Sequence, residues 1–287
     1  MYGILASIID GVLVGSVYGL AAMGLTLIWG VMDVINLAHG AMIVAGMFGV
    51  FLLTDSLGLP PYAAIGPTMV LGFFVGVLLY WIAVHRVIGR PALMSLLSTF
   101  SADMVLIGLG TAVWGTVLFN VPVSLPGITW RGYTFTGTHI LAAVLTAVIA
   151  GGLYLFLNYA RLGKAIRAVS DNREAAELAG IPTTQVLSLA FGLGVALACT
   201  SGALIATLFP FTVLSGGAYQ LKSFVVTVLG GLGNPAGALF GGLALGLLEG
   251  LATPFIPVSW IPVIEFVVFV VVLIAAPRGL FNFRRRS

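Results

Sequence analysis

Long apolar segments separated by short polar stretches set the pattern of this 287-residue chain. A segment of about 20 apolar residues can cross the hydrocarbon core of a bilayer as a helix. The seventh and eighth segments are short, and Gly230 to Pro235 between them predicts either a tight turn or the break of a discontinuous helix. The predicted segments are residues 5–29, 35–54, 62–84, 92–119, 139–158, 184–208, 221–233, 236–252 and 260–276.

These segments predict an all-α, polytopic integral membrane protein with eight to nine hydrophobic segments, including broken or re-entrant helices. Residues 1–287 are expected to form a single transmembrane domain. Composition agrees, because 60% of the residues are hydrophobic, 7% are charged and the mean hydropathy is +1.16. Soluble domains carry about 25% charged residues. The single Cys199 excludes a disulfide within the chain.

Glycines recur every four residues on several predicted helices. Small residues at this spacing let two helix backbones approach closely in lipid. Each ladder therefore predicts a packed face, either within this bundle or against a second membrane subunit. The ladders are Gly11, Gly15 and Gly19, then Gly242, Gly246 and Gly250, and the pair Gly72 and Gly76.

Basic residues gather in three places, and cytoplasmic loops are the ones enriched in Lys and Arg. With nine crossings, the C-terminus is predicted to be cytoplasmic and the N-terminus outside, and a re-entrant segment would change this parity. Arg131 and Lys222 lie outside these three places. Residues 121–138 become an outer loop whose Trp130, Tyr133 and Phe135 suit the membrane interface. The residues in the three places are Arg86, Arg90, Arg161, Lys164, Arg167, Arg173, Arg278, Arg284, Arg285 and Arg286.

Polar residues inside apolar segments are the candidates for a translocation pathway, because such residues tend to face a cavity or a partner in lipid. Asp33, Asn36 and His39 share one face if their stretch is helical, where they line a pathway or satisfy backbone groups between two helices. Asp103 is the best isolated candidate for contact with a polar ligand. Glu249 and Glu265 rank lower, and the scatter of carboxylates along the chain weakens a proton relay. The remaining candidates are Ser98, Thr99, Ser101, Gly230 and Gly231.

Signatures of other chemistry are missing from the sequence. Lys164 follows Gly163 but lacks the upstream glycine and the following Ser or Thr of a phosphate-binding P-loop. The three histidines and one cysteine show no metal-ligand spacing, and no nucleophile motif occurs. We therefore predict no catalytic residues, no metal site and no nucleic-acid interface, and nucleotide energy would have to come from another subunit.

The charged loop at residues 160–183 cannot lie in lipid. Asp171 followed by Glu174 predicts a capping box, while Gly180 and Pro182 predict the end of a helix of about two turns. This helix either lies on the membrane surface as a connection or presents small residues to another protein.

Four stretches together resemble a known family. The chain is similar to LivH-like permease subunits of branched-chain amino acid ABC importers, and the resemblance spans nearly its whole length. The stretches are Gly24–Gly30 with Asn36–Gly40, Leu162–Ile181, Gly230–Ala238 with Gly241 and Gly242, and Pro277–Phe281.

The resemblance implies a multi-pass protein of a bacterial or archaeal plasma membrane (in bacteria the inner membrane). Its implied partners are a second, LivM-like permease, two ABC ATPase subunits that bind ATP and Mg, and a periplasmic substrate-binding protein, with no cofactor in this chain. The loop at 160–183 would be the coupling helix that docks on an ATPase. The implied coupling residues are Gly163, Arg167, Ala168, Asp171, Asn172, Glu174, Ala175, Ala176, Leu178 and Gly180.

Phe100, Ser101 and Ala102 depart from the apolar sequence that the family usually has before Asp103. This departure leaves the substrate open among branched-chain or related amino acids, urea, amides and aromatic acids. A different class also remains, namely an ion- or proton-coupled secondary transporter or channel, which would use intramembrane carboxylates and broken helices without ATP. The capped helix favours the ATP-driven class.

Overall fold

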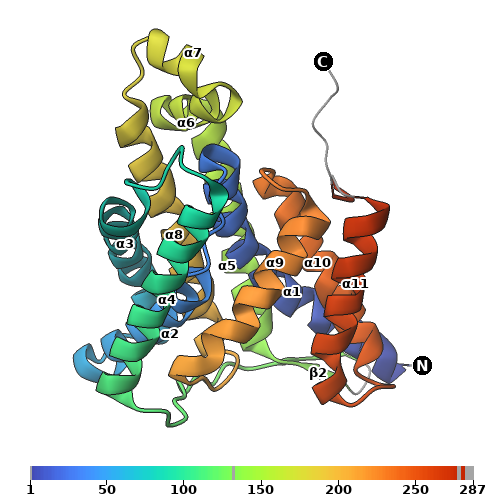
Figure 1. The fold of residues 1–287 in the computed structure, drawn as a ribbon. Helices are drawn as coiled ribbons and strands as arrows, with labels where there is room; N and C mark the ends of the chain where they lie inside the picture. Colours follow the sequence, from blue (N-terminus) through green and yellow to red (C-terminus); the bar gives the residue numbers. More distant parts are fainter. Residues whose placement is uncertain (1, 131–132, 277–278, 282–287) are drawn as a thin grey trace.

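The computed structural model describes residues 2–130, 133–276 and 279–281, which form a helical bundle with one small hairpin (Figure 1). In chain order the elements are α1 (Tyr2–Met32), α2 (His39–Leu57), α3 (Pro61–Leu79) continued by a π-helical turn (Tyr80–Val84), α4 (Ala92–Trp114), β1 (Ile128–Trp130), β2 (Tyr133–Phe135), α5 (Gly137–Tyr159), α6 (Arg161–Asp171), α7 (Arg173–Leu178), α8 (Thr183–Ala206), a 3₁₀ turn (Val213–Ser215), α9 (Gly216–Gly230), α10 (Pro235–Ala252), a second 3₁₀ turn (Val258–Trp260) and α11 (Ile261–Ala275).

Within the described residues, eight helical spans are long and apolar enough to cross a membrane. They are α1 to α5, α8, α10 and α11, taken with their short helical extensions. The remaining predicted segment, the seventh (221–233), corresponds to α9, which has 15 residues. The all-α, multi-pass prediction is thus confirmed. The fourth segment was predicted too long, because α4 ends where Gly115 takes a φ of 67°.

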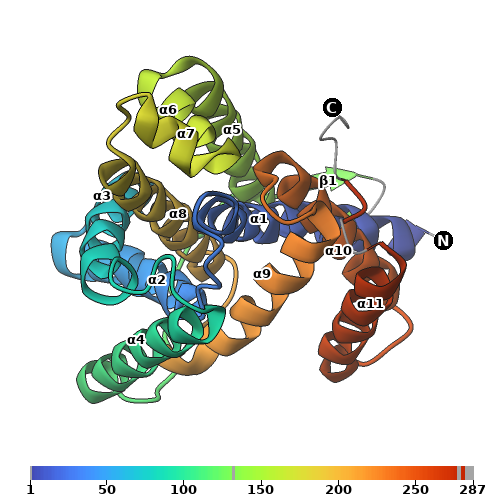
Figure 2. The same cartoon turned by 45° about the horizontal axis from the view of Figure 1, so that its top comes forward.

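The centre of the bundle is formed by α1 and α8, while α4 and α11 lie at the outside (Figure 2). In the apolar stretch with which α8 could span a membrane, 89% of the residues are buried, against 11% in α4 and 17% in α11. Large apolar side chains on the outer helices are exposed, including Phe100 and Val105 on α4 and Phe266 and Ile274 on α11. In a membrane-spanning chain, such faces suit lipid or another apolar helix.

The two long glycine ladders pack directly against each other. A Cβ atom added to Gly15 would lie 2.5 Å from the carbonyl oxygen of Gly242, and one on Gly11 would lie 2.3 Å from that of Gly246. Gly72 and Gly76 of α3 pack in the same way on α8, against Cys199 and neighbouring residues. The predicted close-packed faces are therefore found within one chain.

Helices α9 and α10 form a hairpin whose turn is the glycine-rich sequence. Gly237 lies against the carbonyl oxygen of Gly230, and one turn further Gly241 lies against that of Val226. The turn uses positive φ angles at Gly231 (94°) and Gly233 (79°), and Asn234 caps α10 by accepting from the amide of Gly237. Of the two readings of this sequence, the structure has the tight turn.

The two ends of the bundle differ. One end carries α6 and α7, which project beyond the other helices (Figure 1), and we call it the α6–α7 end. The α9–α10 turn lies at this end and contacts residues 279–281, since the amide of Leu280 donates to Leu229 O at 2.9 Å. The start of α1 and the β1–β2 hairpin lie at the opposite end.

The hairpin was not predicted and occupies part of the expected outer loop. Ile128 pairs with Phe135 in an antiparallel register. The side chains of Trp130 and Tyr133, and all of Arg131, lie outside the described residues, as do Pro277, Arg278 and residues 284–286 at the C-terminus.

Candidate functional site

The charged loop folds into two helices rather than one. Helix α6 is amphipathic, and its buried side carries Gly163, Ile166 and Val169 at a spacing of three residues. Gly163 allows the helix to sit on the end of α5, because an added Cβ would lie 2.1 Å from Phe156 O. The opposite side of α6 presents Lys164 and Arg167 to solvent. Packing on α5 thus fixes α6 at the end of the bundle.

The predicted cap of the second helix was placed one residue too early. Asp171 is the last residue of α6, and Asn172 caps α7 by accepting a hydrogen bond from the amide of Ala175 at 2.9 Å. The end was predicted correctly, since Gly180 takes a φ of 83° after Leu178. An extended Asn172 is what separates the two helices, with a φ of −156°.

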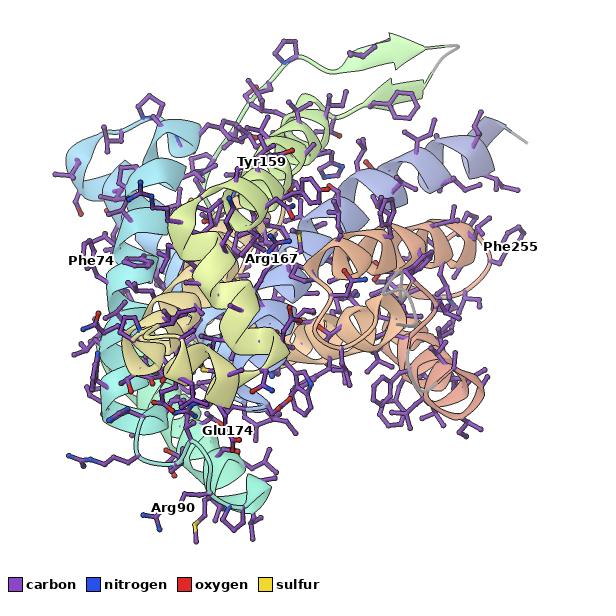
Figure 3. All side chains as sticks on the ribbon, turned by 90° about the horizontal axis from the view of Figure 1, so that it is seen from above. Phe74, Arg90, Tyr159, Arg167, Glu174 and Phe255 are labelled. Atoms are coloured by element: carbon purple, nitrogen blue, oxygen red, sulfur yellow. The ribbon has the colours of Figure 1, made fainter. Side chains whose placement is uncertain are left out.

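Helix α7 exposes nearly all of its side chains. Ala176 is buried, while Arg173, Glu174, Ala175 and Glu177 face outward. Leu178 is 91% exposed, more than any other large apolar side chain in the described part of the chain. In a view onto this end, Glu174 and Arg167 lie over the bundle, whereas Phe74 and Phe255 lie at its outer edges (Figure 3). The exposed Leu178 therefore belongs to an end face rather than to the lipid-facing perimeter.

Helix α6 is connected to the end of α1. The Ser170 hydroxyl donates to the backbone carbonyl oxygen of Gly30. A cavity of about 420 Å³ beside this bond is lined by Arg167 and Asp171 of the loop and by Gly233 and Asn234 of the α9–α10 turn.

A second cavity, of about 570 Å³, also lies against the end of α1. Its lining includes Asn172 and Arg173 of the loop, Asp33 at the end of α1, and Arg90 before α4. Predicted coupling residues and one predicted pathway residue thus share this cavity.

The connection between α1 and α2, residues 33–38, is not helical, so the condition under which Asp33, Asn36 and His39 would share one helical face is not met. Helix α1 ends at Met32, and Asp33 has a φ of 53°, a left-handed conformation that Asp tolerates better than most residues. Asp33 is exposed, whereas Asn36 and His39 are buried. The three side chains therefore meet different surroundings.

The connection runs back into the bundle. The His39 Nε2 atom donates to the carbonyl oxygen of Ala21 at 3.0 Å. Ala21 is eleven residues from the end of α1, a distance of roughly 16 Å at 1.5 Å per residue. Helix α2 thus begins deep in the bundle, and non-helical backbone at membrane depth must find its hydrogen bonds within the protein.

Two side chains supply those hydrogen bonds. Thr99 of α4 accepts from the amide of Leu37 at 3.2 Å, and its hydroxyl oxygen lies 3.0 Å from Ile35 O. Gln220 of α9 accepts from the amide of Gly40 and donates to Asn36 O at 3.2 Å. Residues 33–38 are thus held from two sides by helices that are distant in sequence.

Sequence reasoning found Thr99 but missed Gln220. The available signal was the pair of polar residues, Gln220 and Lys222, at the start of a short apolar segment.

The other predicted pathway residues have varied surroundings. Asp103 is half-buried beside the backbone of Ala41, in the first turn of α2. Ser98 donates to Ala83 O, and the exposed Ser101 donates to Leu97 O of its own helix at 2.8 Å. Gly230 and Gly231 lie in the α9–α10 hairpin. Thr99 and Asp103 are thus the members of the α4 group that reach the start of α2.

No group of three His, Cys, Asp or Glu side chains able to hold a metal ion occurs in the described parts of the chain. The described polar groups at the α6–α7 end are charged and neutral side chains and backbone groups around two cavities. This arrangement suits contact with another protein and movement of helices.

Comparisons with known proteins point to one family. The family described as "Branched-chain amino acid transport system / permease component" matches residues 7–277. The permease protein LivH of a high-affinity branched-chain amino acid transport system from Escherichia coli K12 is 28% identical over 295 residues, covering 96% of this chain and 94% of LivH. BraD of Pseudomonas aeruginosa, named as a permease of such a system, is 28% identical over 304 residues and covers 98% of this chain and 96% of its own length.

An archaeal relative is similar to the same degree. A probable branched-chain amino acid transport permease protein LivH from Methanocaldococcus jannaschii is 28% identical over 282 residues, covering 91% of this chain and 87% of the relative. No solved structure matches this chain significantly.

Proposed function

This chain belongs to the branched-chain amino acid transport permease family, and we propose that it is a permease subunit of an ABC importer that moves branched-chain or related amino acids into the cell. Its partners would be two ATPase subunits that bind ATP and Mg, a second LivM-like permease and a periplasmic substrate-binding protein. The chain itself contributes the membrane pathway and a surface that receives the movement of the ATPases.

The observation that carries the proposal is the exposed helix α7 on a projecting end of the bundle. Leu178 is 91% exposed there, so the described part of this chain leaves it uncovered, and the projection of α7 supports a position outside the lipid. Exposed apolar side chains with polar surroundings suit a protein interface. Charged neighbours such as Arg173 and Glu174 would orient the partner by complementary charge. An ATPase subunit is the partner that a permease without its own phosphate-binding loop needs.

The basic residues support a cytoplasmic α6–α7 end. Arg90, before α4, and Arg173, in α7, line the same cavity, so two basic groups that are far apart in sequence meet at one end of the bundle. Basic loops favour the cytoplasmic side. Residues 279–281 contact the α9–α10 turn at that end, which would place the C-terminal part of the chain inside the cell.

The bond between Ser170 and Gly30 supports a route for coupling. Movement of α6 by an ATPase would shift the end of α1, then the 33–38 connection, and then the start of α2 at Thr99 and Gln220. Alternation between inward- and outward-facing states needs an element with two arrangements, and a non-helical connection between two helices is suited to that role. Substrate would pass beside the start of α2, where Asp103 lies.

An interface variant tests the proposal. Leu178→Asp in the assembled transporter should release the ATPase subunits during purification and abolish substrate-stimulated ATP hydrolysis. Leu57→Asp is the matched control, since Leu57 is 67% exposed but ends α2, away from α6 and α7. Retention of the ATPases and of uptake by Leu178→Asp would refute the docking role of α7.

Substrate choice needs a separate measurement. Substrate uptake into proteoliposomes should be driven by ATP. Leucine, isoleucine or valine should compete with the substrate for this uptake. Uptake driven by an ion gradient without ATP would instead support the secondary-transporter class.

A further inference from the structure

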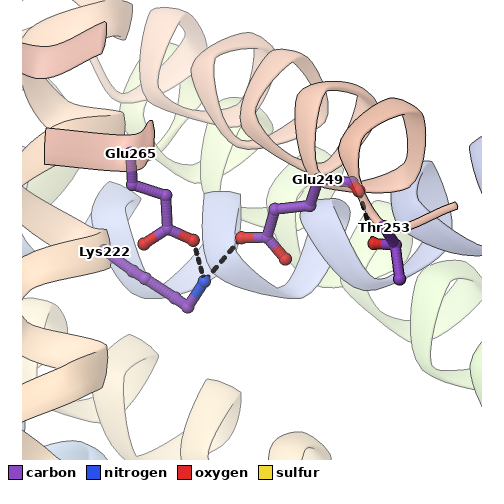
Figure 4. A network of polar contacts seen from close by, with 4 residues as sticks. All are labelled: Lys222, Glu249, Thr253 and Glu265. Carbon is purple, nitrogen blue, oxygen red and sulfur yellow. Dashed lines mark hydrogen bonds and ion pairs between the residues drawn. The ribbon is translucent and has the colours of Figure 1, made fainter. Parts of the chain in front are cut away.

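Three charged side chains that are distant in sequence meet inside the bundle near the opposite end from α6 and α7. The ammonium group of Lys222 on α9 donates to Glu249 Oε1 of α10 at 2.5 Å and also to Glu265 Oε1 of α11 (Figure 4). Thr253, also drawn there, bonds the backbone of Glu249 and not its carboxylate. The carboxylates that looked scattered along the sequence are thus brought together by one lysine.

The cluster is shielded from water. The Glu265 side chain is 1% exposed, and those of Lys222 and Glu249 are 15% and 17% exposed. The Lys222 nitrogen also lies 4.8 Å from the ring centre of Tyr18 on α1, and Tyr219 is the next titratable side chain on α9. A cation over an aromatic face is stabilised there, so the Tyr18 ring adds a favourable contact for the ammonium group.

Other helices packed against α9 and α10 bring no compensating charge. Helix α2 contacts α9, but its His39 is bonded to Ala21 O. Helix α5 contacts α10, but its His139 is bonded to Asp10 of α1. Among the described residues, the charge of the cluster is therefore set by Lys222, Glu249 and Glu265.

Two ionised carboxylates with one ammonium group would leave one net negative charge. An uncompensated charge is strongly unfavourable in a low-dielectric interior, and two carboxyl groups that share one site retain a proton for this reason. The carboxyl groups of Glu249 and Glu265 both contact the same Lys222 nitrogen, so the two groups lie close together. We propose that Lys222, Glu249 and Glu265 form a proton-binding site, in which one proton shared by the two carboxyl groups makes the cluster electrically neutral.

The proton also serves to hold α11. This helix packs mainly on α9, and its buried residues are Ile261, Glu265 and Val272. In lipid, apolar packing alone gives little preference for helix contact over contact with acyl chains. The polar contact of Glu265 at the middle of this face therefore fixes α11, and loss of the proton weakens it through repulsion from Glu249.

Infrared spectroscopy of the chain in lipid nanodiscs, with only its glutamate carboxyl groups carbon-13 labelled, tests the proposal. Labelling excludes Asp103 and the other aspartates, and leaves Glu174, Glu177, Glu249 and Glu265. At neutral pH the labelled carbonyl band of a protonated acid should correspond to one group per chain, and it should disappear as the pH is raised. A wild-type spectrum without this band at neutral pH would overturn the proposal.

Variants show which side chains hold the proton. Glu249→Gln should remove the band, because Lys222 and Glu265 then balance one to one, while Lys222→Met should double it. The paired control Glu174→Gln with Glu177→Gln changes exposed residues of α7 and should leave the band unchanged. A band that survives in Glu249→Gln would show that the proton is not shared and contradict the proposed site. The wild-type pH titration decides the question even where a variant fails to fold.

Discussion

The hydroxyl group of Ser170 on α6 is hydrogen-bonded to the backbone carbonyl oxygen of Gly30, two residues before α1 ends at Met32. This contact joins the projecting helices to the first membrane helix directly. The non-helical connection to α2 begins at the next residue, Asp33. A displacement of α6 would therefore act on the end of α1 that leads into this non-helical connection.

Removing this hydrogen bond should impair coupling more than folding. Ser170→Ala deletes one partly buried hydrogen bond, which contributes about 1 kcal/mol to stability. We expect normal insertion and nearly normal melting temperature, but more ATP hydrolysed per substrate molecule transported in proteoliposomes. Lys164→Ala, an exposed change on the same helix, is the control and should leave that ratio unchanged. An unaltered ratio in Ser170→Ala would remove this bond from the coupling route.

The membrane helices and their close contacts were predictable because they depend on local patterns. Apolar runs of sufficient length predicted the spans, and the spacing of Gly11, Gly15 and Gly19 predicted a packed face. The end of α7 was also predictable, since Gly180 and Pro182 act through their own backbones. What the spacing could not predict was the partner of each face, which turned out to be the second glycine ladder.

The start of α2 and the charged cluster were not predictable, because both depend on contacts between distant residues. Nothing local around Asn36 breaks a helix as proline would, and the connection persists because Thr99 and Gln220 satisfy its backbone. Lys222 lies 27 residues from Glu249 and 43 from Glu265, so no helical spacing relates them. Chain folding alone brings these three residues together.

Thr99→Val should disturb the start of α2 at nearly constant side-chain volume. The substitution leaves the amide of Leu37 and the carbonyl oxygen of Ile35 without their side-chain partner. A buried unsatisfied group costs about 1–3 kcal/mol, so we expect a lower melting temperature and reduced uptake. Ser101→Ala, which affects an exposed hydroxyl bonded within its own helix, provides the comparison. Equal melting temperatures for the two variants would contradict the bridging role of Thr99.

Gly15→Ala should separate α1 from α10. The added methyl group would lie 2.5 Å from Gly242 O and 2.7 Å from Gly246 Cα, so the backbones must move apart. Overpacking of this kind costs about 1–3 kcal/mol, which thermal unfolding in detergent would detect as a lower midpoint. Gly108→Ala is the matched control, because nothing lies within 4 Å of a Cβ built there. A similar midpoint for both variants would exclude tight packing of the two ladders.

The melting temperature should depend on whether Lys222 is replaced alone or together with Glu249 and Glu265. Lys222→Met leaves Glu265, 1% exposed, without its cation, so its carboxyl group must take up a proton to become neutral; removing one partner of a buried ion pair costs about 3–5 kcal/mol. Replacing Lys222, Glu249 and Glu265 together by Met, Gln and Leu removes every charge, and such exchanges are often neutral in stability. We therefore expect the single variant to melt at a lower temperature than the triple variant, measured by intrinsic fluorescence in nanodiscs. If the triple variant melted at the lower temperature, the three side chains would stabilise the contact between α9 and α11 by more than the cancellation of their charges.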